Sequence, residues 1–104
     1  MAISTITSTN VLAKRLRQAR QTLGLPQDKL GVLIGIDEGC SSARISRYES
    51  GIHQPPLPTV QLLAKILCVP TAFLFCEDDL LAEAIIKLSK LSKTELASFI
   101  AEIN

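Results

Sequence analysis

The sequence predicts an all-α fold, and three observations support that prediction. No window of the chain shows the sustained alternation of apolar and polar residues that a half-buried strand requires. Apolar residues make up 47% of the chain and aromatic residues only 4%, so the core must be built from Leu, Ile, Val and Ala, which suits packed helices. The five glycines and five prolines lie mostly at the ends of helical repeats. A chain of 104 residues is long enough for one domain with a real core, and too short for two.

The first predicted helix begins at Thr9 or Asn10, both suitable N-cap residues, and ends where Gly24 follows Leu23. Its apolar stripe consists of residues at helical spacing: Leu12, Leu16, Ala19 and Leu23. The basic residues between them are expected to lie in solvent: Lys14, Arg15 and Arg17. Pro26 suits a position at or just before the start of a second helix, where the first N–H groups have no partner within the helix. The expected core contacts of that helix are Leu30, Leu33 and Ile34.

The next segment has the spacing of two short helices joined by a sharp turn. Helices that cross steeply need a small side chain at their closest approach, and Gly31 supplies one. Gly35 can then adopt a positive φ at little steric cost, which suits the turn. Beyond the turn, Ile45 and Tyr48 lie three positions apart on one helical face, and the helix ends near Gly51. This pattern predicts a helix-turn-helix, whose second helix can lie in the major groove of DNA.

Two further helices complete the predicted domain. A loop over residues 52–56 leads to a fourth helix with apolar residues at helical spacing: Leu57, Val60, Leu63, Ala64 and Leu67. Pro70 then precedes a short fifth helix, which directs Phe73 and Leu74 inward. We therefore expect a DNA-binding domain over residues 9–76.

Residues 79–104 predict an additional pair of helices. Ser92 and Glu95 have the spacing of a capping box, which marks the start of the last helix. Such an apolar pair, added to a complete five-helix core, needs a surface to cover it, and it either packs back on its own core or forms a dimer. We favour dimerisation, because DNA readers of this kind usually work as two-fold pairs. The residues expected at the interface are Ile85, Ile86, Leu88, Leu91, Leu96, Phe99, Ile100 and Ile103.

The composition gives no support to several other classes of function. The cysteines, Cys40, Cys68 and Cys76, form no C-x-x-C pair, and the single histidine, His53, offers no zinc cluster, so we expect neither a metal nor another cofactor. The sequence has no glycine-rich phosphate loop or catalytic constellation, so we expect no enzyme activity. The N-terminal residues lack the pattern of a signal peptide and the longest apolar run is too short for a membrane span, so we expect a soluble, cytoplasmic protein.

The net charge of +1 conceals an asymmetry between the two halves of the chain. Residues 1–54 hold seven Lys or Arg against four Asp or Glu, a net charge of +3. Residues 55–104 hold four Lys against six Asp or Glu, a net charge of −2. A basic half joined to an acidic half is what we expect of a protein whose basic half binds DNA. The excess is small, so non-specific affinity should be modest and strongly dependent on salt.

An ordered set of residues between positions 13 and 74 is more specific than any one motif. Its members are Arg20, Leu23-Gly24-Leu25, Gln27, Leu30-Gly31, Gly35, Ile45-Ser46-Arg47-Tyr48-Glu49-x-Gly51, Pro55, Leu63-Ala64 and Leu67-x-Val69. Together they resemble the Cro/CI-type (lambda-repressor-like, XRE-family) helix-turn-helix family. The resemblance implies a five-helix bundle that reads operator sequences in double-stranded DNA. It also implies an ion pair between Arg20 and Glu49 that ties the first helix to the end of the third.

The chain departs from this family between the turn glycine and Ile45, where roughly four residues are inserted, close to one helical turn of about 3.6 residues. The insert could therefore lengthen the recognition helix at its N-terminus without changing its phase. It could equally form a longer turn. We favour the longer turn, with Gly39 as its pivot, because glycine and serine are poor in helix interiors and Ser41 or Ser42 is a good N-cap.

If Ile45 and Tyr48 face the core, the opposite face of the same helix is the reading surface. The residues expected to contact bases are Ser42, Ala43, Arg44, Ser46 and Arg47. Arg47 is the first candidate, since arginine can donate two hydrogen bonds to guanine O6 and N7, although its charge could instead pair with a nearby carboxylate. The residues expected to contact the DNA backbone are Gln27, Ser41, Ser50, His53 and Gln54.

These features lead to two hypotheses about function. The first is a homodimeric, sequence-specific DNA-binding transcriptional regulator, a repressor, that binds a two-fold operator. The alternative is an antitoxin or a protein-interaction module whose apolar C-terminal helices bind a different protein.

Overall fold

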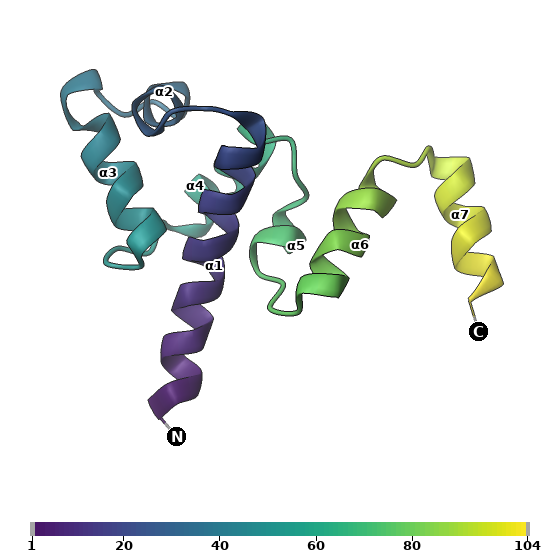
Figure 1. Cartoon of the computed structure of the whole chain (residues 1–104). Helices are drawn as coiled ribbons and strands as arrows, with labels where there is room; N and C mark the ends of the chain where they lie inside the picture. Colours follow the sequence, from purple (N-terminus) through teal and green to yellow (C-terminus); the bar gives the residue numbers. More distant parts are fainter. Residues whose placement is uncertain (1, 104) are drawn as a thin grey trace.

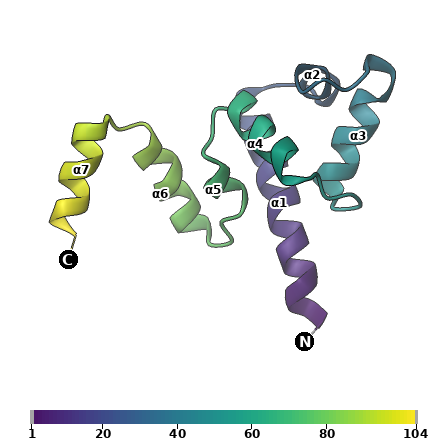
Figure 2. The same ribbon diagram turned by 180° about the vertical axis from the view of Figure 1, so that it is seen from behind.

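The computed structural model describes the backbone of residues 2–103 and the side chains of residues 11–103. All regular structure in this part of the chain is helical, which confirms the predicted all-α class. The helices are α1 (Ala2–Leu23), α2 (Gln27–Leu33), α3 (Glu38–Ser50), α4 (Leu57–Ile66), α5 (Thr71–Leu74), α6 (Asp79–Ser89) and α7 (Lys93–Glu102). Figures 1 and 2 show α1 to α5 gathered into one body, with α6 and α7 to one side of it.

One apolar core joins the helices of this body. Leu16 of α1, Leu30 of α2, Ile45 of α3 and Leu63 of α4 are completely buried. The other apolar residues of the cluster are Leu12, Ala19, Tyr48, Val60, Ala64, Leu67, Phe73, Leu74 and Ala82. Complete burial of one large aliphatic side chain stabilises a fold by about 1.5–3 kcal/mol. The core therefore fixes the position of α3 against the other helices.

Helix α1 is longer than predicted. It begins at Ala2 rather than at Thr9 or Asn10, so both predicted cap positions lie inside the helix, and their side chains lie outside the described residues. A good cap residue permits a helix to begin but does not prevent a helix from running through it. Gly24 ends α1 as predicted, with φ at +70°.

Three apolar residues predicted for the core are largely exposed because they lie at or near helix ends. Leu23, Leu33 and Leu57 are 50%, 53% and 56% exposed. Beyond α2 the chain turns, and Ile34 and Ile36 pack against the core instead of Leu33. The apolar repeat locates the buried face of each helix but not the residue at which that face leaves the core.

Arg15 was predicted to lie in solvent, and this prediction is wrong. Its side chain is buried, whereas Lys14 and Arg17 are exposed as expected. Arg15 stands three residues after Leu12 and four before Ala19, so it shares the buried face of α1. Periodicity counts arginine as polar, and it cannot reveal the backbone carbonyls that satisfy this guanidinium from a distant part of the chain.

Helices α6 and α7 form an arm that is only partly attached to the body. Ala82 of α6 is buried, and Ile85 and Ile86 pack against the core, but α7 contains no buried residue. Ser92 and Glu95 form the predicted capping box at the start of α7. The radius of gyration is 15.1 Å, whereas a compact domain of this length has about 13 Å. Of the two arrangements predicted for the arm, packing on its own core therefore holds for one side of α6 but not for α7.

Candidate nucleic-acid interface

The crossing of α2 and α3 depends on the missing side chain of Gly31. A Cβ atom placed on this residue would lie 1.9 Å from Ser41 Oγ and 2.9 Å from Ser41 Cβ. This confirms the predicted role of Gly31 at the closest approach. Ser41 was predicted to contact the DNA backbone, and this prediction is wrong. It is fully buried, and its hydroxyl donates a hydrogen bond of 2.5 Å to the backbone carbonyl of Asp28, which locks the two helices together.

The inserted residues lengthen the recognition helix. Helix α3 begins at Glu38, and the carboxylate of Asp37 caps it by accepting a hydrogen bond of 3.1 Å from the backbone N–H of Gly39. The prediction of a longer turn that pivots on Gly39, with Ser41 or Ser42 as N-cap, is therefore wrong. Aspartate caps a helix as well as serine does, and one glycine in a first turn costs less than about 1 kcal/mol. Gly35 does make the turn, with φ at +92°.

Helix α3 has one face inside the protein and one outside. Ser41, Ile45, Tyr48 and Glu49 are buried, which confirms the predicted inward direction of Ile45 and Tyr48. The five residues predicted to contact bases are all exposed: Ser42, Ala43, Arg44, Ser46 and Arg47. In the described part of the chain neither arginine forms an ion pair, so nearby carboxylates leave both charges free. Their contact with bases stays a prediction.

The lengthened helix adds two residues to this exposed face that were not predicted. Glu38 and Gly39 stand four positions before Ser42 and Ala43, so each continues one of the outward rows by a turn. The row through Gly39 and Ala43 ends at Arg47. The spacing of four residues could have revealed this continuation, had the insert been assigned to the helix.

Arg20 and Glu49 form the predicted ion pair between α1 and α3. Arg20 Nε donates to Glu49 Oε2 at 2.5 Å and Arg20 Nη2 donates to Glu49 Oε1 at 3.0 Å, so the contact is bidentate. The Glu49 side chain is only 4% exposed. Gln27, predicted to contact the DNA backbone, donates its amide to Glu49 Oε1 at 3.1 Å. This side chain therefore joins the ion-pair network, which orients the start of α2 against the end of α3.

The last residue of α3 and the loop after it are the remaining positions predicted to contact the DNA backbone. Ser50, His53 and Gln54 are all exposed. Gly51 follows α3 with φ at +81° and lets the chain leave the helix, while the hydroxyl of Ser50 donates to the backbone carbonyl of Arg47. These residues lie beside the end of α3, and their contact with phosphates stays a prediction. Pro26 at the start of α2 provides no side-chain cap.

The described residues contain neither a candidate metal centre nor a candidate membrane span. No group of three or more His, Cys, Asp and Glu side chains there is placed to hold a metal ion. No helix in that part of the structure combines the length and apolar character needed to cross a membrane.

The tight crossing of α2 and α3, and the exposed outer face of α3, define a helix-turn-helix DNA-binding domain. Residues 11–73 match the family model described as "Helix-turn-helix domain", and the chain belongs to this family. This match confirms the resemblance to a helix-turn-helix DNA-binding domain that was drawn from the sequence.

Named relatives and a solved structure agree with this assignment. The chain is 34% identical over 64 residues to uncharacterized HTH-type transcriptional regulators of Sinorhizobium medicae (strain WSM419) and Rhizobium meliloti (strain 1021). The matched region is 62% of this chain and 43% of each relative, so the chain spans less than half of their length. The crystal structure of the transcriptional regulator BswR superposes with a TM-score of 0.81 at 44% identity, over 88% of this chain and 93% of that one.

Proposed function

We propose that this protein is a cytoplasmic, homodimeric regulator that places one α3 helix in the major groove at each half of a two-fold operator. The observation that carries the proposal is the outer face of α3, where two arginines that form no ion pair with any described side chain stand among small side chains. The small residues Ser42, Ala43 and Ser46 allow the helix to approach the base edges closely. The free cysteines of the described chain suit a reducing compartment.

The exposed side chains of α3 that are predicted to contact bases have chemistry suited to such contacts. Arg47 can donate two hydrogen bonds to guanine O6 and N7, a contact that discriminates by about 1–3 kcal/mol. The methyl group of Ala43 can touch a thymine methyl group, and Ser42 and Ser46 can donate or accept with either base pair. Arg44 lies beside this row and can reach a base or a phosphate. We assign sequence reading to Arg47 first.

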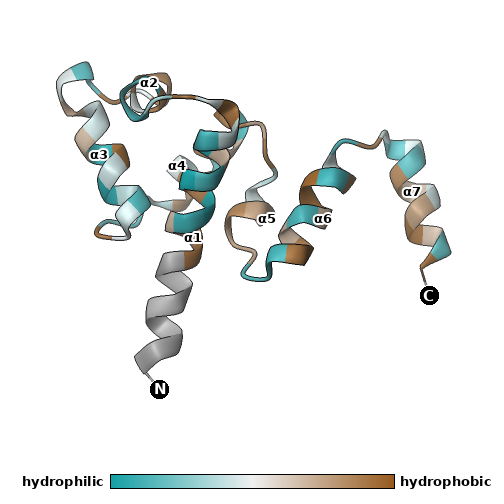
Figure 3. Cartoon of the chain, in the orientation of Figure 1, coloured by the Kyte–Doolittle hydropathy of each residue, from teal (hydrophilic) through white to brown (hydrophobic). Residues whose placement is uncertain are grey.

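The arm supplies the proposed dimer interface. The most exposed of its predicted contact residues lie on α7 and directly after it: Phe99 and Ile100 are 45% and 59% exposed, and Ile103, which follows the helix, is 61% exposed. Figure 3 shows hydrophobic residues along both α6 and α7. The α6 residues Leu80 and Leu81, which were not predicted for the interface, are also exposed. A second copy that covered these side chains would remove a large apolar surface from water.

Repression is the mode of regulation that we propose for this dimer. A two-fold complex with α3 in two successive major grooves covers at least one turn of the duplex. An operator placed within a promoter would then be closed to other proteins by steric exclusion alone. This mode requires no surface of the regulator beyond the DNA-binding and dimer contacts.

Selection of bound fragments from random duplexes by the intact protein tests the proposal. We expect enrichment of a two-fold motif whose half-sites are centred about 34 Å apart, roughly one turn of DNA. Fluorescence anisotropy at two salt concentrations should show that affinity for the selected duplex falls less steeply with salt than affinity for random duplex, because base contacts do not release counterions. No enrichment and no binding at low salt would remove the proposal.

The exposed arm also favours a second candidate, an antitoxin or interaction module in which α6 and α7 bind a different protein. The same apolar residues would then cover a partner of unlike sequence. A mass measurement of the purified protein in solution discriminates between the two. A dimer supports self-association, whereas a stable monomer with its arm open supports a heteromeric partner.

A further inference from the structure

Arg15 forms a buried joint between α1 and the chain that leads into the arm. Its Nε donates to the backbone carbonyl of Cys76 at 2.8 Å, and its Nη2 donates to the carbonyl of Glu77 at 3.1 Å. Nη2 also donates to Asp79 Oδ1 at 2.9 Å, at the first residue of α6. The guanidinium lies 5.5 Å from the centroid of the Phe73 ring, and the whole side chain is 2% exposed.

Besides Arg15, the link between the body and α6 consists of apolar packing by Ala82, Ile85 and Ile86 and of one exposed ion pair. In Figures 1 and 2, α5 and the short segment that follows it lie between α1 and α6. Ala82 is buried, but the ion pair of Lys14 with Asp79, at 3.1 Å, is exposed on both sides. Hydrogen bonds from Lys14 and from Arg15 hold the pKa of Asp79 below its ordinary value. Exposed pairs hold geometry weakly, so Arg15 is the main polar contact of the joint, beside the apolar contacts of Ala82, Ile85 and Ile86.

Helix α1, which carries Arg15, also holds the recognition helix α3 in place. Arg20 stands five residues after Arg15 in α1 and grips Glu49 of α3 through two hydrogen bonds. Helix α1 thus carries two arginines with separate tasks: Arg20 fixes the direction of α3, and Arg15 fixes the start of α6. A helix is stiff over one or two turns, so the two contacts define the angle between α3 and the arm.

We infer that Arg15 is a positioning residue that sets the distance between the two α3 helices of the dimer, and so the half-site spacing that the dimer accepts. This inference rests on the proposed homodimer. In a molecule 49 Å long, a tilt of about 10° at the joint acts over a lever of about 25 Å and moves α3 by about 4 Å, more than the base-pair rise of about 3.4 Å. Loss of the joint therefore changes which spacings fit, while each α3 keeps its own contacts.

The test compares the purified protein with Arg15→Lys, which keeps the charge but lacks the planar fork needed to reach two carbonyls and a carboxylate. Arg17→Lys is the matched control, because Arg17 is an exposed arginine of the same helix. Each protein is titrated by anisotropy against a single half-site and against paired half-sites whose spacer changes by one base pair at a time. The half-site is the sequence that the protein itself selects.

The wild type and Arg17→Lys are expected to show one preferred spacing, with about a tenfold loss of affinity for each base pair of departure. Arg15→Lys is expected to reduce that loss to less than about threefold while its affinity for the single half-site stays within about twofold. A folded, dimeric Arg15→Lys protein that keeps the wild-type spacing profile would overturn the inference.

A second variant keeps the test decisive if Arg15→Lys does not fold. Asp79→Asn removes the carboxylate that Arg15 and Lys14 share, and this side chain is 75% exposed, so the fold should survive. We expect a partial flattening of the same spacing profile, and an unchanged profile would count against the joint. A wild-type protein that is monomeric or binds no DNA at any spacing would instead refute the proposed function.

Discussion

Gly31→Ala is expected to lower the free energy of unfolding by about 3 kcal/mol, at the upper end of what overpacking of a core usually costs. The added Cβ would lie 1.9 Å from Ser41 Oγ and 3.1 Å from the Ser41 Cα atom, so rotation of the serine side chain cannot relieve the whole clash. Helices α2 and α3 must separate, and the hydrogen bond from Ser41 to Asp28 is lost as they do. Urea unfolding followed by circular dichroism measures the change.

Gly39→Ala is the control for this prediction. Gly39 is also in a helix, but its added Cβ would have only Asp37 Oδ2 within 4 Å, at 3.3 Å. We expect no loss of stability, or a gain of up to about 1 kcal/mol from the better helix former. The double variant Gly31→Ala with Ser41→Gly should recover part of the loss, because it removes the two closest atoms. Equal stability of Gly31→Ala and Gly39→Ala would show that the helix crossing is not tight.

Arg20→Ala is expected to destabilise the protein by about 3–5 kcal/mol, because it leaves a buried carboxylate without its cation. The Glu49 side chain is 4% exposed and would keep only the amide of Gln27 as a partner. Arg20 also donates to the backbone carbonyl of Leu25 at 3.0 Å, so the chain between α1 and α2 loosens too. Thermal and urea unfolding report the loss.

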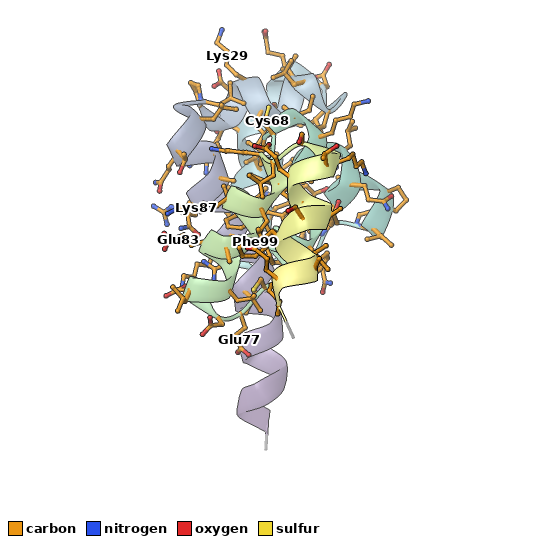
Figure 4. All side chains as sticks on the ribbon, turned by 90° about the vertical axis from the view of Figure 1, so that its right-hand side faces the viewer. Lys29, Cys68, Glu77, Glu83, Lys87 and Phe99 are labelled. Carbon is orange, nitrogen blue, oxygen red and sulfur yellow. The ribbon has the colours of Figure 1, made fainter. Side chains whose placement is uncertain are left out.

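Glu83→Gln provides the contrast with an exposed pair. Glu83 and Lys87 project from one side of α6 in Figure 4, and their charged atoms lie 3.0 Å apart with side chains 58% and 75% exposed. Removal of one partner of such a pair should change stability by less than about 0.5 kcal/mol. Replacement of both members of the buried pair, as Arg20→Met with Glu49→Leu, should restore part of the stability. If Arg20→Ala cost no more than Glu83→Gln, the pair would not hold α1 to α3.

The sequence was sufficient for the features that depend on local spacing. The apolar repeats located the helices, and the small side chain of Gly31 located the crossing. The resemblance, rather than the spacing, supplied the pair of Arg20 and Glu49. Each of these predictions used either a periodic signal or an ordered motif, which a single sequence contains.

The predictions that failed required knowledge of tertiary partners. The burial of Arg15 depends on backbone carbonyls near Cys76, which no helical repeat can reveal. The role of Ser41 depends on the backbone of Asp28 across the helix crossing. The start of α3 differs from the prediction because Asp37, which is as good an N-cap as serine, caps the helix before either serine is reached. Serine and arginine are polar by type, but their surroundings decide whether they face solvent.

Sequence reading by the outer face of α3 is tested by the loss of affinity on Arg47→Ala, compared between the selected duplex and a random one. Arg17→Ala serves as the control, since it removes an exposed positive charge from α1 instead of α3. We expect Arg47→Ala to weaken binding to the selected duplex by about 1–3 kcal/mol per half-site and to relax preference at one base pair. Binding to random duplex should weaken far less, and the control should weaken both duplexes alike. An equal loss on both duplexes for Arg47→Ala would show that the outer face of α3 does not read sequence.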